Sequence, residues 1–555
     1  MLQIALFLFL CAYAHGVSVT TTEGELIGSK AQDGDYYVFY GVPYAGPTDR
    51  DNRFKAPVPA VPYPGPLTAL DSNVMCAQPT ERGLVGVENC LKLNIFTKNV
   101  TTPKPVYVFL NSHEYTTSPI QTMFSYKDLV EKDIVFVTMN FRLSVFGFLC
   151  LGVPEAPGNA GLKDVIHGLK WIQENIASFG GNPNNVVLLG HGAGAAVVDL
   201  ITLTPQSQNL VHKAIALSGS ALAPWAVAYE PIQHAQLLGD RLGYAGKSSE
   251  DLAINLIITD IHVINSGLDF KFQNNTPIFA PCIEDPNVNG SLLTDAPINV
   301  LRSGNYSHIP VIYGYTSKEG TLRVTEAASG DWLTLMQNNF TDFLQVDLKF
   351  NENTTVEAAN IRNFYFSNSA ISMATIDDYL DYQGDTLVLV STIRTAIARA
   401  STTSSEVRLM ELGYMGTSNT DWGYNQVPLN GAKHGDFLNY LFNYDLRQVD
   451  QPVRTSIVNR IVGFANNWNS LRAVTAWPPL TPSVTNYLYY GGNGEPLNNS
   501  AIHTEEYKVI LHPQRMTFWN SLYDRYYVAP TFNSSSTAIV SVVFVMLCQL
   551  VVRFF

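Results

Sequence analysis

The sequence predicts an α/β protein in which a large, mostly parallel central sheet is flanked by helices. Short apolar runs rich in Val, Ile and Phe recur along the chain, and stretches of helical period separate them. Uninterrupted apolar runs are typical of strands that are buried on both faces. With 555 residues, of which 46% are hydrophobic, the chain can bury one large core.

The expected elements alternate along one domain that extends over residues 17–530. Buried strands are expected at residues 106–110, 134–140, 186–189, 214–217, 311–315 and 407–412. Helices are expected at residues 161–179, 195–203, 376–400 and 456–468. The strand at 186–189 runs straight into the turn G-H-G-A-G at 190–194. A strand, a sharp glycine-rich turn and a helix form the setting of a nucleophile elbow.

Both ends of the chain carry apolar segments. Residues 4–12 and the A-Y-A pattern that follows predict a signal peptide over residues 1–14. Residues 533–555 combine small polar residues with an apolar tail, which is typical of a GPI-attachment signal, with Asn533 and Ser534 as candidate anchor positions. A short membrane anchor is the alternative. We therefore expect the secretory pathway and the extracellular face of the plasma membrane.

Cysteines and glycosylation motifs also indicate an extracellular chain. Cys76 and Cys90 would close a short loop, and such bridges persist outside the cytosol. Cys150 and Cys282 lie in apolar runs, where a free buried thiol is the simpler expectation. N-x-S/T motifs predict glycosylation at Asn99, Asn274, Asn289, Asn305, Asn339, Asn353 and Asn498.

Charge and motif content exclude several classes of function. The net charge of −13 argues against nucleic acid as a partner. No glycine-rich phosphate loop or dinucleotide motif has the required strand–turn–helix setting, so no cofactor is expected. The residues His113, His191, Glu114, Glu319 and His434 do not have the spacing of a known metal motif, so no metal site is expected.

Eight segments occur in a fixed order and carry a family resemblance. They read F-Y-G-V-P-Y-A at 39–45, R-F-K-A-P at 53–57, E-N-C-L-K-L-N-I at 88–95, N-F-R-L at 140–143, P-G-N-A-G-L-K-D at 157–164, F-G-G-N-P at 179–183, L-S-G-S-A at 217–221 and G-A-K-H-G-D at 431–436. The chain resembles the type-B carboxylesterase/lipase family, which is cholinesterase-like, over about residues 20–525. The resemblance implies an α/β-hydrolase fold and a disulfide between Cys76 and Cys90.

The resemblance also implies positions for the catalytic groups. Glu319, in G-Y-T-S-K-E-G, matches the acid of the triad, and His434 matches the base. The family's G-E-S-A-G reads G-H-G-A-G here, so Gly192 stands where the nucleophilic serine is expected. Removing that serine alone costs roughly 10⁶ in turnover where triads have been dissected. The sequence therefore predicts a catalytically impaired member.

The oxyanion loop differs from the family pattern as well. Where the family reads H-G-G-G-F, Ser112 and His113 replace glycines and Glu114 adds a negative charge. Glycines allow the backbone to aim two N–H groups at one point. The Ala193 N–H is the one donor expected to remain. A single chance replacement could explain Gly192, but it could not also explain the altered residues of the oxyanion loop. Two losses that affect the same chemical step therefore predict a natural non-hydrolase.

Three functions follow as hypotheses. The first is a non-catalytic cell-surface glycoprotein that acts in recognition or adhesion through an extracellular protein partner. The second is a binder of an apolar small molecule, in a cavity that Tyr115, Phe124, Trp225 and Trp332 could line. The third is a residual or atypical ester hydrolase with a displaced nucleophile, for which Ser112, Ser218 and Ser220 are candidates.

Overall fold

A computed structural model describes residues 16–532 apart from short gaps at 81, 120–122, 269–271, 329, 368, 418–430, 443–445, 467–476, 483, 496–499 and 510–511. The signal peptide predicted at 1–14, the anchor predicted at 533–555 and the glycosylation motif at Asn498 lie outside the described residues. Among the described residues, no helix is long and apolar enough to cross a membrane.

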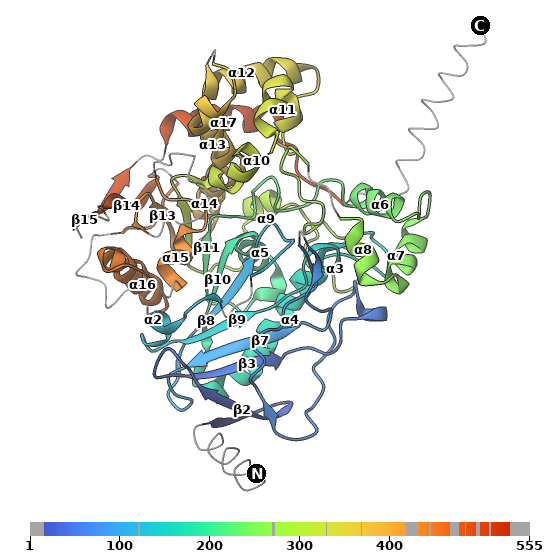
Figure 1. Ribbon diagram of the computed structural model, residues 1–555, viewed down its shortest axis with the longest axis vertical. Coiled ribbons are helices and arrows are strands. Elements are labelled where there is room, and N and C mark those ends of the chain that lie inside the picture. The colour runs from blue at the N-terminus through green and yellow to red at the C-terminus, as the bar shows by residue number, and fades with distance from the viewer. Residues whose placement is uncertain are drawn as a thin grey trace.

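A 13-stranded sheet forms the centre of the molecule (Figure 1). Its strands follow the order β1-β2-β3-β7-β9-β8-β10-β11-β12-β13-β14-β15, and β4 pairs with β2. The pairings from β9 to β14 are parallel, and those at both edges are antiparallel. The prediction of a large, mostly parallel sheet is confirmed.

The strands of this sheet have the following bounds: β1 Val17–Thr21, β2 Gly24–Lys30, β3 Tyr37–Pro43, β4 Leu67–Thr68, β7 Lys92–Thr97, β8 Lys104–Ser112, β9 Val135–Met139, β10 Gly181–Gly192, β11 Lys213–Leu217, β12 Val311–Thr316, β13 Val407–Leu412, β14 Asn486–Glu495 and β15 Ser500–Val509. A separate hairpin pairs β5 Gln78–Thr80 with β6 Gly83–Val85.

Helices cover both faces of the sheet, and their bounds are as follows: α2 Lys127–Val130, α3 Ser144–Phe148, α4 Ala160–Asn175, α5 Ala193–Thr202, α6 Pro231–Arg241, α7 Ser249–Ile258, α8 Ile261–Ser266, α9 Pro297–Ser303, α10 Val324–Ala328, α11 Trp332–Asn338, α12 Thr354–Phe366, α13 Ile376–Gly384, α14 Val390–Thr402, α15 Asp436–Phe442, α16 Gln451–Ala465 and α17 Pro513–Tyr526. In Figure 1, α10 to α13 and α17 gather at the top, and α6 to α8 lie at the right.

The expected elements are present, and three of them differ notably in extent. The strand expected at 186–189 is the longer β10, which includes the first glycines of the turn. The helix expected at 376–400 consists of α13 and α14 with a π-helical segment, Asp385–Leu389, between them. The late helix α16 begins at Gln451 instead of 456. Its first turn contains a proline, which is favoured there because the first backbone N–H groups of a helix have no acceptor within the helix and proline has no N–H.

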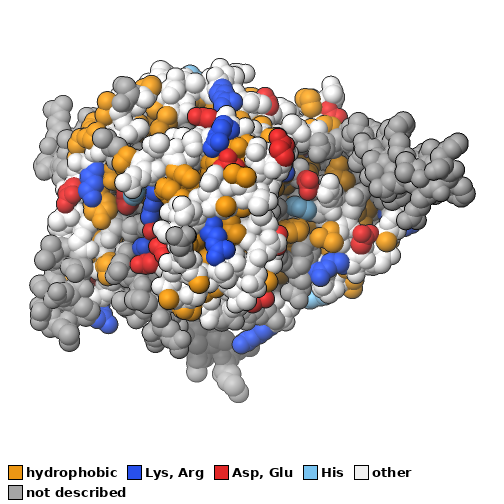
Figure 2. Space-filling view, turned by 90° about the horizontal axis from the view of Figure 1, so that it is seen from above, with side chains coloured by type: hydrophobic (Ala, Val, Ile, Leu, Met, Phe, Trp, Pro, Cys, Tyr) orange, Lys and Arg blue, Asp and Glu red, His pale blue; other side chains and the backbone are white. Residues whose placement is uncertain are grey.

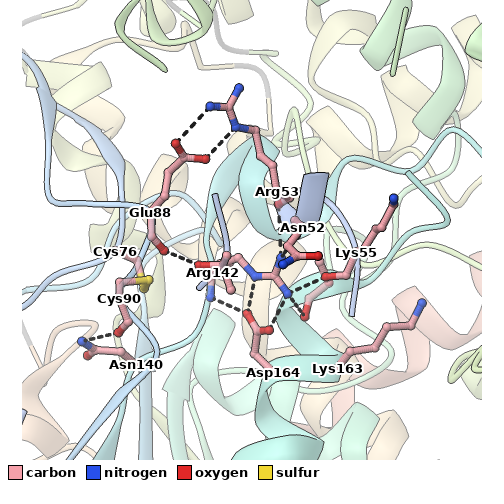
Figure 3. Close-up of polar contacts among 12 residues, drawn as sticks. Asn52, Arg53, Lys55, Cys76, Glu88, Cys90, Asn140, Arg142, Lys163 and Asp164 are labelled. Atoms are coloured by element: carbon pink, nitrogen blue, oxygen red, sulfur yellow. Dashed lines mark hydrogen bonds and ion pairs between the residues drawn. A yellow bond between two sulfur atoms is a disulfide. The ribbon is translucent and has the colours of Figure 1, made fainter. Parts of the chain in front are cut away.

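Buried ion pairs explain why several of the family-like segments have their polar residues. Arg142 donates to both carboxylate oxygens of Asp164 and to the carbonyl oxygens of residues 52, 53 and 55 (Figure 3). Arg53 pairs with Glu88 in the same region. A charge that is buried without partners would cost several kcal/mol. These pairs therefore fasten the N-terminal segments onto the body of the fold.

Among the described residues, two disulfides are present. The one predicted between Cys76 and Cys90 is confirmed. The expectation of free thiols at Cys150 and Cys282 is wrong, because these residues form a second disulfide with Cα atoms 6.5 Å apart. They are 132 positions apart in the chain, and apolar neighbours in the sequence do not show which segments meet in space.

Candidate functional site

The glycine-rich turn between β10 and α5 has the geometry of a nucleophile elbow. Gly192 has φ 58° and ψ −125°, in the region that favours glycine. A Cβ at Gly190 would lie 2.3 Å from the Gly194 carbonyl oxygen, and one at Gly194 would lie 2.2 Å from that of Leu110. At Gly192 the nearest atom would be 3.4 Å away. The flanking glycines are thus sterically required, whereas position 192 has room for a side chain.

The residues expected as acid and base lie together at this elbow. His434 Nδ1 is 2.6 Å from Glu319 Oε2. His434 precedes α15, and its backbone N–H donates to Thr321 Oγ1 at 2.9 Å. Its Nε2 lies 3.7 Å from where a Cβ at Gly192 would stand. A serine at 192 would therefore point its hydroxyl toward the free nitrogen of a histidine that Glu319 orients.

The second oxygen of Glu319 is fixed by two donors. Ser218 Oγ donates to Glu319 Oε1 at 2.6 Å, and the Thr316 N–H donates to the same atom at 2.7 Å. Ser218 thus positions the acid, and its proton is already engaged. Ser112 and Ser220 are fully buried, and neither hydroxyl has a hydrogen-bond partner among the described residues. None of the three candidate serines lies against a base as a nucleophile would.

A second histidine lies beside the first. The rings of His191 and His434 are 4.8 Å apart, centroid to centroid. Burial is the main cause that holds the pKa of His191 well below its usual value, and the neighbouring His434 and His113 lower it further. His191 is therefore neutral at the base of the site.

The segment that should supply the oxyanion donors has another structure. β8 continues to Ser112, which pairs in register with Gly192, and the Ser112 carbonyl oxygen lies 3.4 Å from the Cβ position of residue 192. The His113 N–H donates to the Thr117 carbonyl oxygen at 2.7 Å. One expected donor is thus already bonded, and an acceptor faces the elbow. Ala193, the first residue of α5, has no intrahelical acceptor for its N–H.

Glu114 has a charged partner in the structure. The sequence places its negative charge beside the oxyanion position, and Glu114 forms an ion pair with Arg323. Arg323 is almost fully buried, and its Nε donates to Asn275 Oδ1 at 2.5 Å. Glu326 lies 3.9 Å from the same guanidinium. The charge of Glu114 is therefore balanced.

Sequence reasoning missed Arg323. It ends the short 3-10 helix Glu319–Arg323, whose first residue is the triad-like acid. Its position four residues after Glu319 is the one signal in the sequence that it could lie near the site. The partner Glu114 is 209 positions away, so the pair itself could not be read from the sequence.

A cavity of about 700 Å³ opens above the elbow. The residues of the elbow and its neighbours line it: Gly192, Ala193, His191, Ser112, His113 and His434. Of the four aromatic residues proposed to line it, Tyr115, Phe124 and Trp225 do so. Trp332 does not line it but packs against Arg323, whose guanidinium carbon is 5.9 Å from the ring centroid. In the described part of the chain, no group of three or more His, Cys, Asp or Glu side chains could hold a metal ion.

Comparisons with known proteins agree with this architecture. Residues 15–518 match the sequence profile of the carboxylesterase family. Esterase B1 of Culex pipiens is 30% identical over 433 residues, which cover 75% of this chain and 80% of that protein. Juvenile hormone esterase of Tribolium castaneum is 28% identical over 471 residues, which cover 79% and 80%.

A solved structure shows the same fold. The crystal structure of juvenile hormone esterase from Manduca sexta, with OTFP covalently attached, matches with a TM-score of 0.81 at 24% identity. The match covers 92% of this chain and 100% of that chain. The fold is therefore the α/β-hydrolase fold. With a family profile that spans most of its length, this chain belongs to the carboxylesterase family.

Proposed function

We propose that this protein binds a small, uncharged and mostly apolar carboxylic ester, or a related carbonyl compound, and that it lacks serine-based catalysis. One observation carries the proposal: a cavity of about 700 Å³ ends on Gly192, beside a Glu319–His434 pair 2.6 Å apart. The cavity lies at the elbow and His434 is present there, whereas position 192 carries no nucleophile.

The walls of the cavity favour an uncharged ligand. Its volume lies in the range of about 300–1,000 Å³ that is usual for small-molecule sites. Tyr115 and Trp225 supply aromatic surface. The guanidinium of Arg323 pairs with both Glu114 and Glu326 and is therefore not available to a ligand anion. An anionic ligand would have to displace these carboxylates or remain unpaired in a partly buried site.

The relatives support an ester as the chemical class. They are named as esterases, and two of them as juvenile hormone esterases. The loss of serine chemistry is supported by Gly192 itself, by the engaged His113 N–H and by the Ser112 carbonyl oxygen at the elbow. A tetrahedral oxyanion would find a single backbone donor there.

Binding can be tested with dodecan-2-one, an apolar ketone that cannot be hydrolysed. Calorimetry on the purified protein should detect saturable binding. Leu438→Trp should weaken it at least tenfold, because Leu438 lines the cavity on α15. Leu237→Trp is the matched control, since this leucine lies on α6, is 37% exposed and does not line the cavity. Absence of binding, or equal binding by both variants, would contradict the proposal.

The location of the protein is a further part of the proposal. Two disulfides support passage through the oxidising secretory pathway. The membrane anchor at Asn533 or Ser534 and the role in recognition or adhesion stay predictions. We place ligand binding ahead of the adhesion role because the cavity is a specific observation, and no described surface has been linked to a partner.

A further inference from the structure

We propose that this protein hydrolyses its bound ester slowly and without an acyl-enzyme, through direct attack by a water molecule held beside Gly192 with His434 as the base. This inference rests on the proposed function, because the ester must first bind in the cavity. It assigns a chemical role to a histidine–glutamate pair that serine catalysis can no longer use.

The space beside Gly192 has the partners that a nucleophilic water needs. The Cβ position of residue 192 is 3.4 Å from the Ser112 carbonyl oxygen and 3.7 Å from His434 Nε2. A water oxygen stays more than about 3 Å from the Gly192 Cα atom, so it would lie beyond the Cβ position, on the side that opens to the cavity, where these two atoms can accept from it. Both are acceptors, so the water donates both of its protons to them and directs a lone pair elsewhere. The Ser112 carbonyl oxygen would repel an oxyanion at this place, but it can accept a hydrogen bond from a water.

Glycine at 192 is essential to the arrangement. Gly190 and Gly194 have no room for a Cβ, so their identity follows from packing alone. Position 192 has that room, and any side chain there would occupy the place of the water. The backbone at Gly192 has the conformation of a nucleophile elbow and faces the cavity. The water therefore approaches the carbonyl carbon of a bound ligand from the side on which a serine hydroxyl at 192 would attack.

The neighbouring groups prepare His434 to accept a proton. Glu319 accepts at Nδ1, which leaves Nε2 as the nitrogen that faces the elbow. Glu319 is itself held by Ser218 and by the Thr316 N–H, so the orientation of the imidazole is fixed. His191 stays neutral because burial lowers its pKa, so it does not oppose a positive charge on His434.

The reaction balances without any further reactant. The water oxygen forms a bond to the ester carbonyl carbon, and one of its protons moves to His434 Nε2. The carbonyl electron pair moves onto the oxygen, which accepts from the Ala193 N–H. When the tetrahedral intermediate collapses, the bond to the alcohol oxygen breaks and that oxygen takes the proton from Nε2. The products are a carboxylic acid and an alcohol, and the imidazole is neutral again.

The test compares hydrolysis of 4-nitrophenyl butyrate by the wild type, Gly192→Ala, His434→Gln and a control. Gly192→Ala places a methyl group where the water would lie, and His434→Gln removes the base. Each should lower kcat at least about 100-fold, since general-base catalysis contributes 10²–10⁴. Gly243→Ala is the control, because it adds a methyl group at another positive-φ glycine with open space around it. It should leave the rate unchanged.

The chemistry also predicts what mass spectrometry should find. The wild type should show no burst of nitrophenol and no butyryl adduct. If Gly192→Ala does not fold, Gly192→Ser replaces it, and this variant should trade steady turnover for a stoichiometric butyryl adduct. Wild-type rates in both Gly192→Ala and His434→Gln, or an adduct on the wild type, would overturn the inference.

Binding of dodecan-2-one separates this inference from the proposed function. If the ketone binds and the two variants hydrolyse the ester as fast as the wild type, only the water mechanism fails. If the ketone does not bind, the proposed function fails and the mechanism fails with it. Ketone binding with hydrolysis that depends on both residues supports both.

Discussion

Single residues decide which chemistry remains at the elbow. Gly192 occupies a backbone conformation that residues other than glycine rarely adopt, at a cost of roughly 1–3 kcal/mol. A Cβ atom at Gly190 or Gly194 would lie 2.2–2.3 Å from a backbone oxygen, which excludes any other residue there. A Cβ atom at position 192 would have no neighbour closer than 3.4 Å. Restoring the serine is therefore a local change whose cost lies in the backbone and not in packing.

Gly192→Ser should create a nucleophile but not an efficient esterase. The serine can reach His434, so a fluorophosphonate probe should label the variant covalently and leave the wild type unlabelled. Turnover of an aryl ester should stay at least about 100-fold below that of an active carboxylesterase assayed alongside, because a missing oxyanion donor costs 10²–10³. The melting temperature should fall slightly. Turnover equal to that of the active enzyme would contradict our description of the loop at His113.

Asp347 should make stability depend on pH. This carboxyl group is fully buried, its Oδ1 has no hydrogen-bond partner among the described residues, and burial raises its pKa from 3.8 to about 7. A raised pKa in the folded state means that the folded protein binds the proton more tightly than the unfolded chain. Its contribution to stability is thus complete below about pH 4 and is lost as the pH rises to about 7.

Asp347→Asn is the variant that tests this dependence. Asparagine cannot ionise, so the variant should lose less free energy of unfolding between pH 4 and pH 8 than the wild type, by up to about 4 kcal/mol. Urea unfolding at the two pH values measures the difference. Parallel pH profiles for the two proteins would show that Asp347 is not the titrating group.

At the scale of elements, the sequence predicted what depends on local pattern. Apolar runs marked the parallel strands, and the segment at 190–194 marked the elbow. The π-helical segment at 385–389 and the disulfide between Cys150 and Cys282 depend on tertiary contacts, which no local pattern contains. The same holds for the site: Glu319 and His434 followed from motifs, but the pairing of Arg323 with Glu114 required the fold.

The two disulfides should differ in what they contribute. Cys150–Cys282 joins residues 132 positions apart, whereas Cys76–Cys90 joins residues 14 positions apart. On the chain-entropy account, loops of these sizes are worth about 4–5 and about 3 kcal/mol. Replacing Cys150 and Cys282 with serine should therefore destabilise the protein more than the same change at Cys76 and Cys90. Urea midpoints under non-reducing conditions measure this, and the reverse order would contradict it.

At the scale of the whole molecule, the site lies where several strands end together. Ser112, Gly192 and Thr316 each lie at the carboxyl end of a parallel strand, which is where α/β sheets place their ligands. The helices α10 to α13 and α17 lie together at one end of the molecule (Figure 1). Seen from that end, charged side chains of both signs are interspersed with apolar ones (Figure 2). This face therefore offers no large patch of one kind of side chain, and the cavity is the feature on which the proposed function rests.

Glycosylation tests the extracellular prediction for the chain as a whole. Asn289, Asn305 and Asn339 are exposed, so protein secreted from insect cells should lose mass on treatment with peptide-N-glycosidase. Asn99 is half-buried, and its Oδ1 accepts from the Thr102 N–H and from Lys104 Nζ, each at 3.0 Å. Asn305→Gln should therefore remove more glycan mass than Asn99→Gln. A secreted chain whose mass does not change on treatment would contradict the prediction of a glycoprotein.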